Sequence, residues 1–302
     1  MMTPENTTSG TLNDTFPGIV GTNITSYDIL TTVIGILAVV SNVLLLIAMV
    51  RYRSTILTSK GAYLIANLAI ADLLTGLNSS LWGLQYAFQL PQALTKAIFS
   101  ILWTTVQTSF LTILVIMSLE RYMAIVFPFK AQVWLSKTRT LKCCVAMWLI
   151  SGMCGACMEL SGEIVQFCFM VVFEITILVT TLLYYKIFMK LRQRRAFLAS
   201  MQPIGARGRR SNVDLQRREY KLTTVLVSLL VILIIRVLPY MVAGQIALVR
   251  YMFTVANHDT ELGLFLCYYL PVELMNFVLN PIVYVWRLPN YRLALLRTLH
   301  CR

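Results

Sequence analysis

The chain has 302 residues, of which 58% are hydrophobic and only 13% are charged, and its mean hydropathy is +0.71. Soluble domains carry about 25% charged residues, so this composition excludes a solvated globular domain, and the long hydrophobic runs exclude a disordered chain. Lys and Arg outnumber Asp and Glu by 26 to 13. A nucleic-acid partner is not expected, because a basic binding surface needs a water-facing domain.

Seven hydrophobic runs are long enough to cross a bilayer, whose hydrocarbon core of about 30 Å takes about 20 helical residues. We therefore expect an all-α membrane protein built as a seven-transmembrane-helix bundle. The segment 288–299 is too short to span, and its mixture of Leu and Arg predicts a short amphipathic eighth helix at the membrane interface. The predicted spans are approximately 28–50, 61–86, 97–125, 140–160, 164–190, 221–247 and 261–285.

The distribution of basic residues predicts the orientation of the spans. Segments 51–60, 127–142, 186–221 and 286–302 together hold 22 of the 26 Lys and Arg residues, and the positive-inside rule places such segments in the cytoplasm. The N-terminal tail holds no Lys or Arg before residue 28 and carries three glycosylation acceptor triplets, at Asn6, Asn13 and Asn23.

We therefore expect a multi-pass protein of the plasma membrane with an extracellular N-terminus and a cytoplasmic C-terminus. The expected parts are a glycosylated tail at 1–27, a seven-helix domain at 28–286 with a third cytoplasmic loop at about 192–218, and an amphipathic helix with a short tail at 287–302.

Four polar residues lie at similar depth within the predicted spans: Asn42 in the first, Asp72 in the second, and Asn276 and Asn280 in the seventh. Polar groups are costly inside a membrane, so each is a candidate functional residue. The four could form a hydrogen-bonded network that specifies helix packing, or they could hold a cation. Both interpretations stay open at this point.

The tripeptide Glu120-Arg121-Tyr122 ends the third predicted span. Arg121 is always charged and needs a partner, which could be Glu120 or Glu219 at the start of the sixth span. An arginine that bridges two helices through carboxylates forms a breakable latch. The alternative is that Arg121 only extends to the lipid head groups.

Pro239 in the sixth span and Pro281 in the seventh each remove a backbone donor. The carbonyl freed in each helix then needs a side chain or water as its partner. Bends at these positions would let a helix end swing outward, which is one way to carry a signal across a membrane.

These features together resemble the signatures of rhodopsin-like (class A) G-protein-coupled receptors, over approximately residues 28–300. The motifs occur in family order: Asn67-Leu-Ala-Ile-Ala-Asp72-Leu-Leu, Glu120-Arg121-Tyr122, Trp148, Tyr184, Pro239, and Asn280-Pro281-x-x-Tyr284. The resemblance implies that Arg121 contacts a heterotrimeric G protein in the active state and pairs with Glu120 and Glu219 at rest. It also implies that Tyr184 and Tyr284 swing inward on activation and that Cys301 is palmitoylated. The four polar residues Asn42, Asp72, Asn276 and Asn280 would form the central polar network, which in many relatives holds sodium.

Several departures from the family pattern resemble the branch of melanocortin, cannabinoid and lysophospholipid receptors. Lys96 stands near the expected disulfide cysteine, only about Leu160–Glu163 can connect the fourth and fifth spans, and Thr176 replaces a proline. The sixth span has Val237 where the family favours tryptophan before Leu-Pro239. Phe110 stands where a small hydroxyl residue helps to bind sodium, which argues against sodium at Asp72, and no metal is expected.

The outer half of the predicted bundle is rich in aromatic residues, which suits a lipid or small amphiphile, with a peptide as the alternative ligand. Arg236 and Glu273 lie at comparable depth and are expected to pair within this cavity. The ligand-pocket candidates are Trp82, Trp103, Gln107, Phe167, Arg236 and Glu273.

We expect no enzymatic activity and no cofactor, because His258 and His300 fall in a loop and the tail, and no nucleophile–base pair lies at catalytic depth. Arrestin, membrane lipids and a second receptor molecule are further candidate partners. The alternatives are a ligand-independent or scaffolding receptor and an ion-conducting or transport protein. The sequence shows no internal repeat of the kind that transporters carry.

Overall fold

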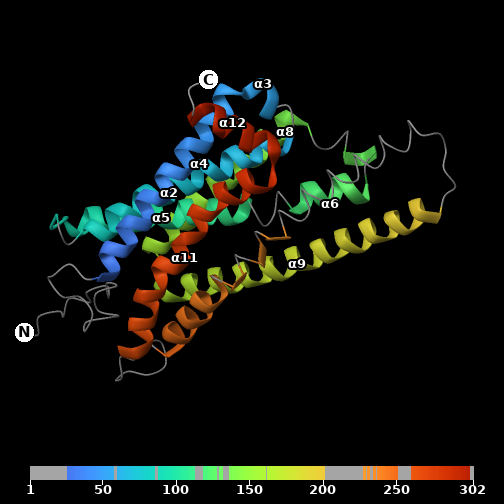
Figure 1. Ribbon diagram of the computed structural model, residues 1–302. Coiled ribbons are helices and arrows are strands. Elements are labelled where there is room, and N and C mark those ends of the chain that lie inside the picture. Colours follow the sequence, from blue (N-terminus) through green and yellow to red (C-terminus); the bar gives the residue numbers. More distant parts are fainter. Residues whose placement is uncertain are drawn as a thin grey trace, which may run out of the picture.

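The computed structural model describes residues 26–57, 60–85, 88–112, 118–127, 129–131, 136–160, 162–200 and 260–299, and 227–250 except for 229, 232, 233 and 236. No strand occurs among these residues. The helices are α2 (Ser26–Arg51), α3 (Arg53–Ile56), α4 (Lys60–Leu84), α5 (Gln92–Leu111), α6 (Ser118–Val126), α8 (Lys137–Leu160), α9 (Gly162–Ser200), α11 (Thr260–Arg287) and α12 (Pro289–Leu299), as Figure 1 shows.

Five helices in the described part of the chain are long and apolar enough to cross a membrane. The expected third span is covered by α5 and α6, on either side of residues 113–117, which lie outside the described residues. The expected sixth span contains the shorter apolar helix Val237–Arg250. The predicted fold class, an all-α bundle of membrane-spanning helices, is thereby confirmed. The five long spans are Ser26–Arg51, Gly61–Leu84, Lys137–Cys157, Met170–Gln193 and Leu262–Trp286.

The helix ends refine the predicted boundaries. Because α8 ends at Leu160 and α9 begins at Gly162, the fourth and fifth spans are joined almost directly. Helix α9 continues to Ser200, so the first part of the segment expected as the third cytoplasmic loop is helical. Helix α12 follows α11 after Leu288, where the sequence predicts an amphipathic helix. The glycosylation triplets and Cys301 lie outside the described residues.

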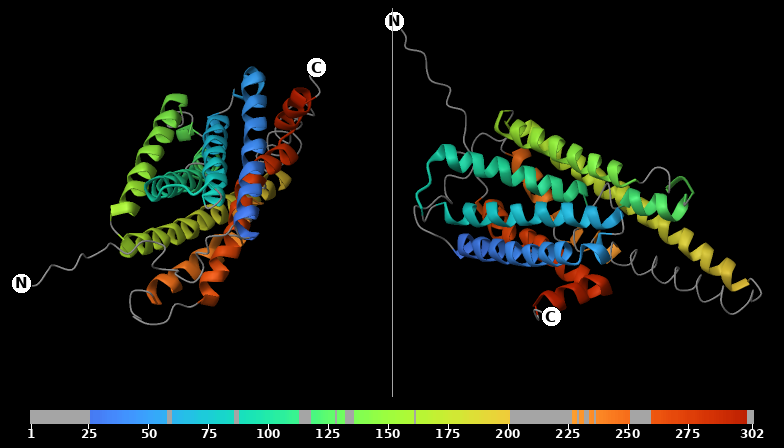
Figure 2. Two further views of the ribbon diagram at one scale, coloured as in Figure 1. Left: turned by 90° about the vertical axis from the view of Figure 1, so that its left-hand side faces the viewer. Right: turned by 90° about the horizontal axis from the view of Figure 1, so that it is seen from above.

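Helices α2 and α4 pack side by side through glycine (Figure 2). A Cβ atom built on Gly35 would lie 2.7 Å from the carbonyl oxygen of Gly76, and one built on Gly76 would lie 2.7 Å from the carbonyl oxygen of Gly35. At so close an approach, a larger side chain at either position would force the two helices to shift. Nearby, the Ser80 hydroxyl donates to the Thr32 carbonyl across the same interface, at 3.4 Å.

Many large apolar side chains remain on the outside of the bundle. Leu149 and Met153 of α8 are 65% and 70% exposed, and Leu178 of α9 is 60% exposed. Soluble proteins rarely expose contiguous apolar surface of this extent, and a bilayer would cover it. The polar groups turn inward instead, and Asn42 and Asp72 are 0% exposed.

Candidate functional site

The centre of the bundle is organised by Asp72. Ser109 of α5 donates a 2.5 Å hydrogen bond to Asp72 Oδ1, and Asn280 of α11 donates a 2.7 Å hydrogen bond to Oδ2. Both carboxylate oxygens of Asp72 are therefore occupied, and one buried residue joins α4, α5 and α11. The sequence places Asp72 and Asn280 at similar depth, and the structure brings them into direct contact. Ser109 was missed by the sequence analysis.

Among the side-chain amides of the predicted polar network, some donor and acceptor atoms are paired and others have no partner. Asn42 Nδ2 donates to the carbonyls of Ala38 (2.9 Å) and Phe277 (3.0 Å). Asn42 Oδ1, Asn276 Nδ2 and Asn280 Oδ1 are buried with no hydrogen-bond partner within the described part of the chain. Because acceptors and a donor occur together, these atoms suit an ordered water molecule, which can both donate and accept.

Each oxygen of Asp72 accepts one hydrogen bond, and an aromatic ring lies in the adjacent position of α5. The expectation that no sodium ion binds at Asp72 stays a prediction. The adjacent residue of α5, Phe110, is 1% exposed, and its ring centroid lies 4.5 Å from that of Phe173 and 6.3 Å from that of Phe277. Ser109 and Phe110 are about 100° apart around the helix, so the hydroxyl reaches Asp72 while the ring fills the space toward α9 and α11.

A second polar link joins α8, α4 and the residue that directly follows α5. Trp148 of α8 donates through Nε1 to Asn67 Oδ1 of α4 at 3.0 Å, and Asn67 Nδ2 donates to Thr112 Oγ1 at 2.9 Å. All four hydrogen-bonding atoms are thereby paired in apolar surroundings. Trp148 belongs to the family motifs, whereas the roles of Asn67 and Thr112 as its partners were not predicted.

The residues expected to contact a G protein are described in part. Glu120 is 9% exposed and lies on α6 together with Arg121 and Tyr122, and the Tyr122 ring packs edge-on against Phe127 at 6.0 Å. The side chain of Arg121 and all of Glu219 lie outside the described residues. The expected latch between them therefore stays a prediction.

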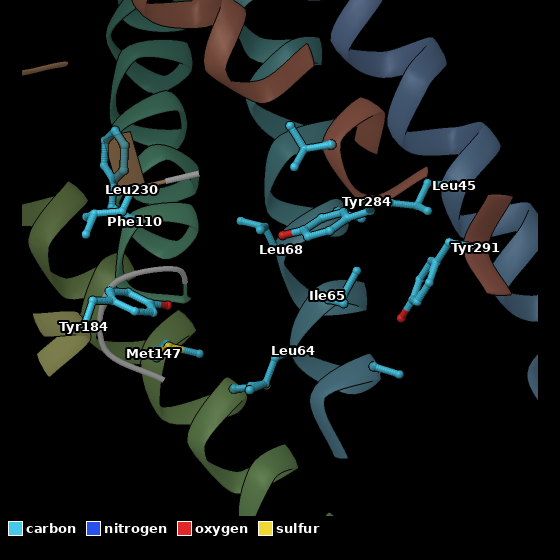
Figure 3. Packing of buried hydrophobic residues seen from close by; sticks show 14 of the residues in the cluster. Leu45, Leu64, Ile65, Leu68, Phe110, Met147, Tyr184, Leu230, Tyr284 and Tyr291 are labelled. Atoms are coloured by element: carbon cyan, nitrogen blue, oxygen red, sulfur yellow. The ribbon is translucent and has the colours of Figure 1, made fainter. Parts of the chain in front are cut away.

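The two tyrosines expected to swing inward lie on opposite sides of a hydrophobic layer. Figure 3 shows Tyr184 beside Met147, and Tyr284 across the cluster with its hydroxyl pointing toward Leu68. Tyr184 is 5% exposed and Tyr284 is 1% exposed. The Tyr284 hydroxyl has no hydrogen-bond partner among the described residues. The apolar layer between the tyrosines must rearrange before their hydroxyls can approach each other.

The half of the bundle that the sequence predicts to face outward combines aromatic rings with a few buried polar groups. Glu273 of α11 is 5% exposed, and Gln107 of α5 is 9% exposed. The Tyr269 ring stacks on Tyr240 with the centroids 6.5 Å apart, and on Phe265 with the centroids 5.1 Å apart. The pocket candidates Trp82, Trp103 and Phe167 are partly buried, on α4, α5 and α9 respectively. Arg236 lies outside the described residues, so its pairing with Glu273 stays a prediction.

Both prolines that the sequence identifies as sites of helix bending have a partner for the carbonyl that they free. Pro281 leaves the Phe277 carbonyl without a backbone donor, and Asn42 donates to it at 3.0 Å. Pro239 likewise leaves the Ile235 carbonyl without a backbone donor, and the Tyr269 hydroxyl donates to this carbonyl at 3.4 Å. In each case the donor comes from a different helix, so each bend is tied to a neighbour.

Groups of His, Cys, Asp and Glu that could hold a metal ion do not occur among the described residues. The described cysteines are free thiols, including Cys154 and Cys157.

Comparison with known families gives a match that runs from the middle of the first predicted span to the end of the fourth. Residues 41–161 match the family model described as 7 transmembrane receptor (rhodopsin family). No curated protein sequence matches the chain significantly. The matched range includes Asn42, Asp72, Glu120-Arg121-Tyr122 and Trp148. The match covers less than half of the chain, and the apolar helices of the described part are those of a multi-pass membrane protein.

Proposed function

We propose that this protein is a G-protein-coupled receptor that binds an extracellular ligand in the outer half of its helix bundle and activates a heterotrimeric G protein at the cytoplasmic side. The observation that carries the proposal is the Asp72 centre, in which Ser109 and Asn280 join three helices within a chain that matches the rhodopsin family. Because these hydrogen bonds link the three helices, a movement at one end of α11 can be transmitted to α4 and α5. We further propose that the N-terminus is extracellular, and that arrestin and a second receptor molecule are partners.

The outer half supports a lipid or a small amphiphile as the ligand. The stacked rings of Tyr240, Tyr269 and Phe265 offer apolar surface, and the carboxyl of Glu273 offers one polar anchor in a buried position. Binding sites for small molecules combine mostly apolar walls with a few polar groups in this way. A basic peptide attracted by Glu273 is the alternative. The proposed branch is that of melanocortin, cannabinoid and lysophospholipid receptors.

At the cytoplasmic side, the proposed activation switch is the latch of Arg121 with Glu120 and Glu219. The layer between Tyr184 and Tyr284 is closed by Leu64 and Leu68, which are both 1% exposed or less. This packing supports a resting state in which the G-protein site is shut. Opening would require the sixth span to bend at Pro239 and α11 to bend at Pro281.

The test is basal G-protein activation in cells, with a sensor for each Gα class. Wild type is compared with Arg121→Ala and Glu219→Gln at matched surface expression, and Lys142→Ala, an exposed basic residue of α8, controls for loss of a positive charge. We expect Glu219→Gln to raise basal activity, Arg121→Ala to abolish it, and Lys142→Ala to leave it unchanged.

If neither wild type nor any of the variants activates a G protein at good surface expression, coupling to a G protein is contradicted. The lack of the family tryptophan before Leu-Pro239 favours a ligand-independent or scaffolding receptor as the second candidate. Basal activity that no extracellular lipid, amphiphile or peptide changes would support that candidate. An ion current that Asp72→Asn abolishes would support a transport function instead.

A further inference from the structure

In the sixth span, the backbone carbonyl that Pro239 leaves without a donor is bonded by a residue of α11, Tyr269. Pro239 has no N–H to donate to the Ile235 carbonyl four residues earlier, and Ile235 itself is 65% exposed on the lipid-facing side of the bundle. An unpaired carbonyl in hydrocarbon is costly. The Tyr269 hydroxyl supplies the missing donor at 3.4 Å. This distance exceeds the usual 2.5–3.0 Å range of O–H···O bonds, so the bond is weak and easily broken.

Tyr269 also contacts the sixth span on the other side of the proline. Its ring stacks on that of Tyr240, the residue directly after Pro239, with an interplanar angle of 18°. Phe265, one turn away on α11, continues the stack at 5.1 Å. Tyr269 therefore holds the backbone before Pro239 through its hydroxyl and the side chain after Pro239 through its ring.

The same stack reaches the interior of the bundle. Tyr240 lies close enough to Glu273 for the two groups to interact electrostatically, and Glu273 is 5% exposed and lies one turn from Tyr269 on α11. A ligand that displaces the Tyr240 ring changes its stacking on Tyr269, and the Tyr269 ring then moves with it. Because the hydroxyl and the ring belong to one rigid phenol, this movement pulls the hydroxyl away from the Ile235 carbonyl.

We propose that Tyr269 is the positioning residue that couples contact of a ligand with Tyr240 to bending at Pro239, in place of the tryptophan that the sixth span lacks. The inference rests on the proposed function, because it assigns the signal path within the same receptor. In the resting state Tyr269 limits the bend. When Tyr240 moves, the Ile235 carbonyl is released and the cytoplasmic end of the sixth span moves outward.

The test measures helix position directly and needs neither a ligand nor a G protein. Spin labels are placed on Cys introduced at Leu141 (44% exposed, α8) and at Val227 (36% exposed, sixth span) of the full chain. The exposed cysteines Cys143, Cys157 and Cys168, and Cys301, are first replaced by serine. Pulsed electron paramagnetic resonance then gives the distance distribution between the labels in purified protein in lipid nanodiscs.

Tyr269→Phe removes only the hydroxyl, and Tyr269→Leu removes the stack as well. We expect Tyr269→Phe to raise the ratio of long-distance to short-distance forms about two- to tenfold, the shift that corresponds to loss of one net hydrogen bond. Tyr269→Leu should give at least this shift. Tyr268→Phe is the matched control, since Tyr268 is the neighbouring tyrosine, is 55% exposed and packs edge-on against Tyr27, and it should give no shift.

A distance distribution of folded Tyr269→Phe that equals wild type would overturn the inference. A purely structural role of Tyr269 would lower the melting temperature without moving the distribution, so melting curves are recorded for every variant. A different result, no basal activation of any G protein in the cell assay, would reject the proposed function. A shifted distribution together with a silent assay would retain the role of Tyr269 in bending and reject G-protein coupling.

Discussion

The side-chain amide of Asn42 in α2 donates a 3.0 Å hydrogen bond to the backbone carbonyl of Phe277 in α11. Pro281, four residues after Phe277, lacks the N–H that would otherwise bind this carbonyl. Asn42 is 0% exposed and Phe277 is 1% exposed, so water from outside the bundle does not reach the pair. Asn42 thus replaces a backbone donor of another helix and fixes the bend of α11 against α2.

Asn42→Ala should lower the free energy of unfolding by about 1–3 kcal/mol, because it leaves the Phe277 carbonyl buried and unpaired. In a Pro281→Ala background the new N–H can bind that carbonyl, so the same change should cost less, by an interaction energy of at least about 0.5 kcal/mol. Thermal unfolding of the four purified proteins in detergent measures this cycle. Ser41→Ala is the control, since the Ser41 hydroxyl bonds only within its own helix, to Ala38. An equal cost of Asn42→Ala in both backgrounds would show that Asn42 does not act through the proline.

The close contact of Gly35 with Gly76 predicts that replacement by alanine destabilises the protein at some glycines and not at others. Gly76→Ala places a methyl group 2.7 Å from a backbone carbonyl that cannot retreat without separating α2 from α4, and we expect a loss of about 1–3 kcal/mol from overpacking. Gly152→Ala in α8 is the matched control, because no atom lies within 4 Å of the added Cβ. This control should be neutral or stabilising by up to about 1 kcal/mol, through helix propensity. Melting temperatures that fall equally for both variants would contradict the packing argument.

The spans could be predicted because hydrophobic length alone determines which helices cross a bilayer. The contact of Asp72 with Asn280 could be anticipated, because polar groups at the same depth in a membrane are stabilised by hydrogen bonding to each other. Ser109 could not be singled out in this way. Helix α5 holds several hydroxyl residues, and Thr104 and Thr108 donate to carbonyls of their own helix, those of Ser100 and Thr104. Only the rotation of α5 about its axis shows which hydroxyl faces Asp72.

The stack of Tyr240 on Tyr269 was also beyond prediction, for a different reason. Aromatic residues are frequent throughout the predicted spans, and whether two rings meet depends on how far two helices are rotated toward each other. The bend at Pro239 contributes to that rotation, and its size is set by tertiary contacts. The sequence therefore identifies the proline and the need for a donor to the freed carbonyl, but not the residue that supplies it.

Ser109→Ala should destabilise the protein by about 1–3 kcal/mol, because it removes the donor to Asp72 Oδ1 in a fully buried position. Thr176→Ala is a suitable control, since the Thr176 hydroxyl donates only to the Val172 carbonyl of its own helix and its hydrogen bond is exposed. Chemical or thermal unfolding of the purified proteins checks the difference. A loss for Ser109→Ala no larger than that for Thr176→Ala would mean that the Ser109 bond adds no stability.

The filled space beside Asp72 predicts a receptor whose stability does not depend on sodium. The melting temperature of wild type should be the same in sodium chloride and in choline chloride at equal concentration. Phe110→Ser removes the ring and adds a hydroxyl, and we expect it to gain a sodium-specific increase of about 2 °C or more. Phe110→Ala removes the ring without adding an oxygen and should gain less. A sodium-specific increase in wild type that Asp72→Asn abolishes would contradict this prediction.

Glu273 is 5% exposed on α11, and Arg236 is the residue that the sequence predicts as its partner. Removal of one partner from a buried ion pair costs about 3–5 kcal/mol, because the other charge is left uncompensated. Glu273→Gln should therefore reduce surface expression strongly, and the exchange of both charges, Arg236→Glu with Glu273→Arg, should restore part of it. Glu174→Gln on α9 is the control, since Glu174 Oε1 is buried with no hydrogen-bond partner in the described part of the chain and its charge should be dispensable. Surface expression and basal signalling of Glu273→Gln that both equal wild type would refute the pair.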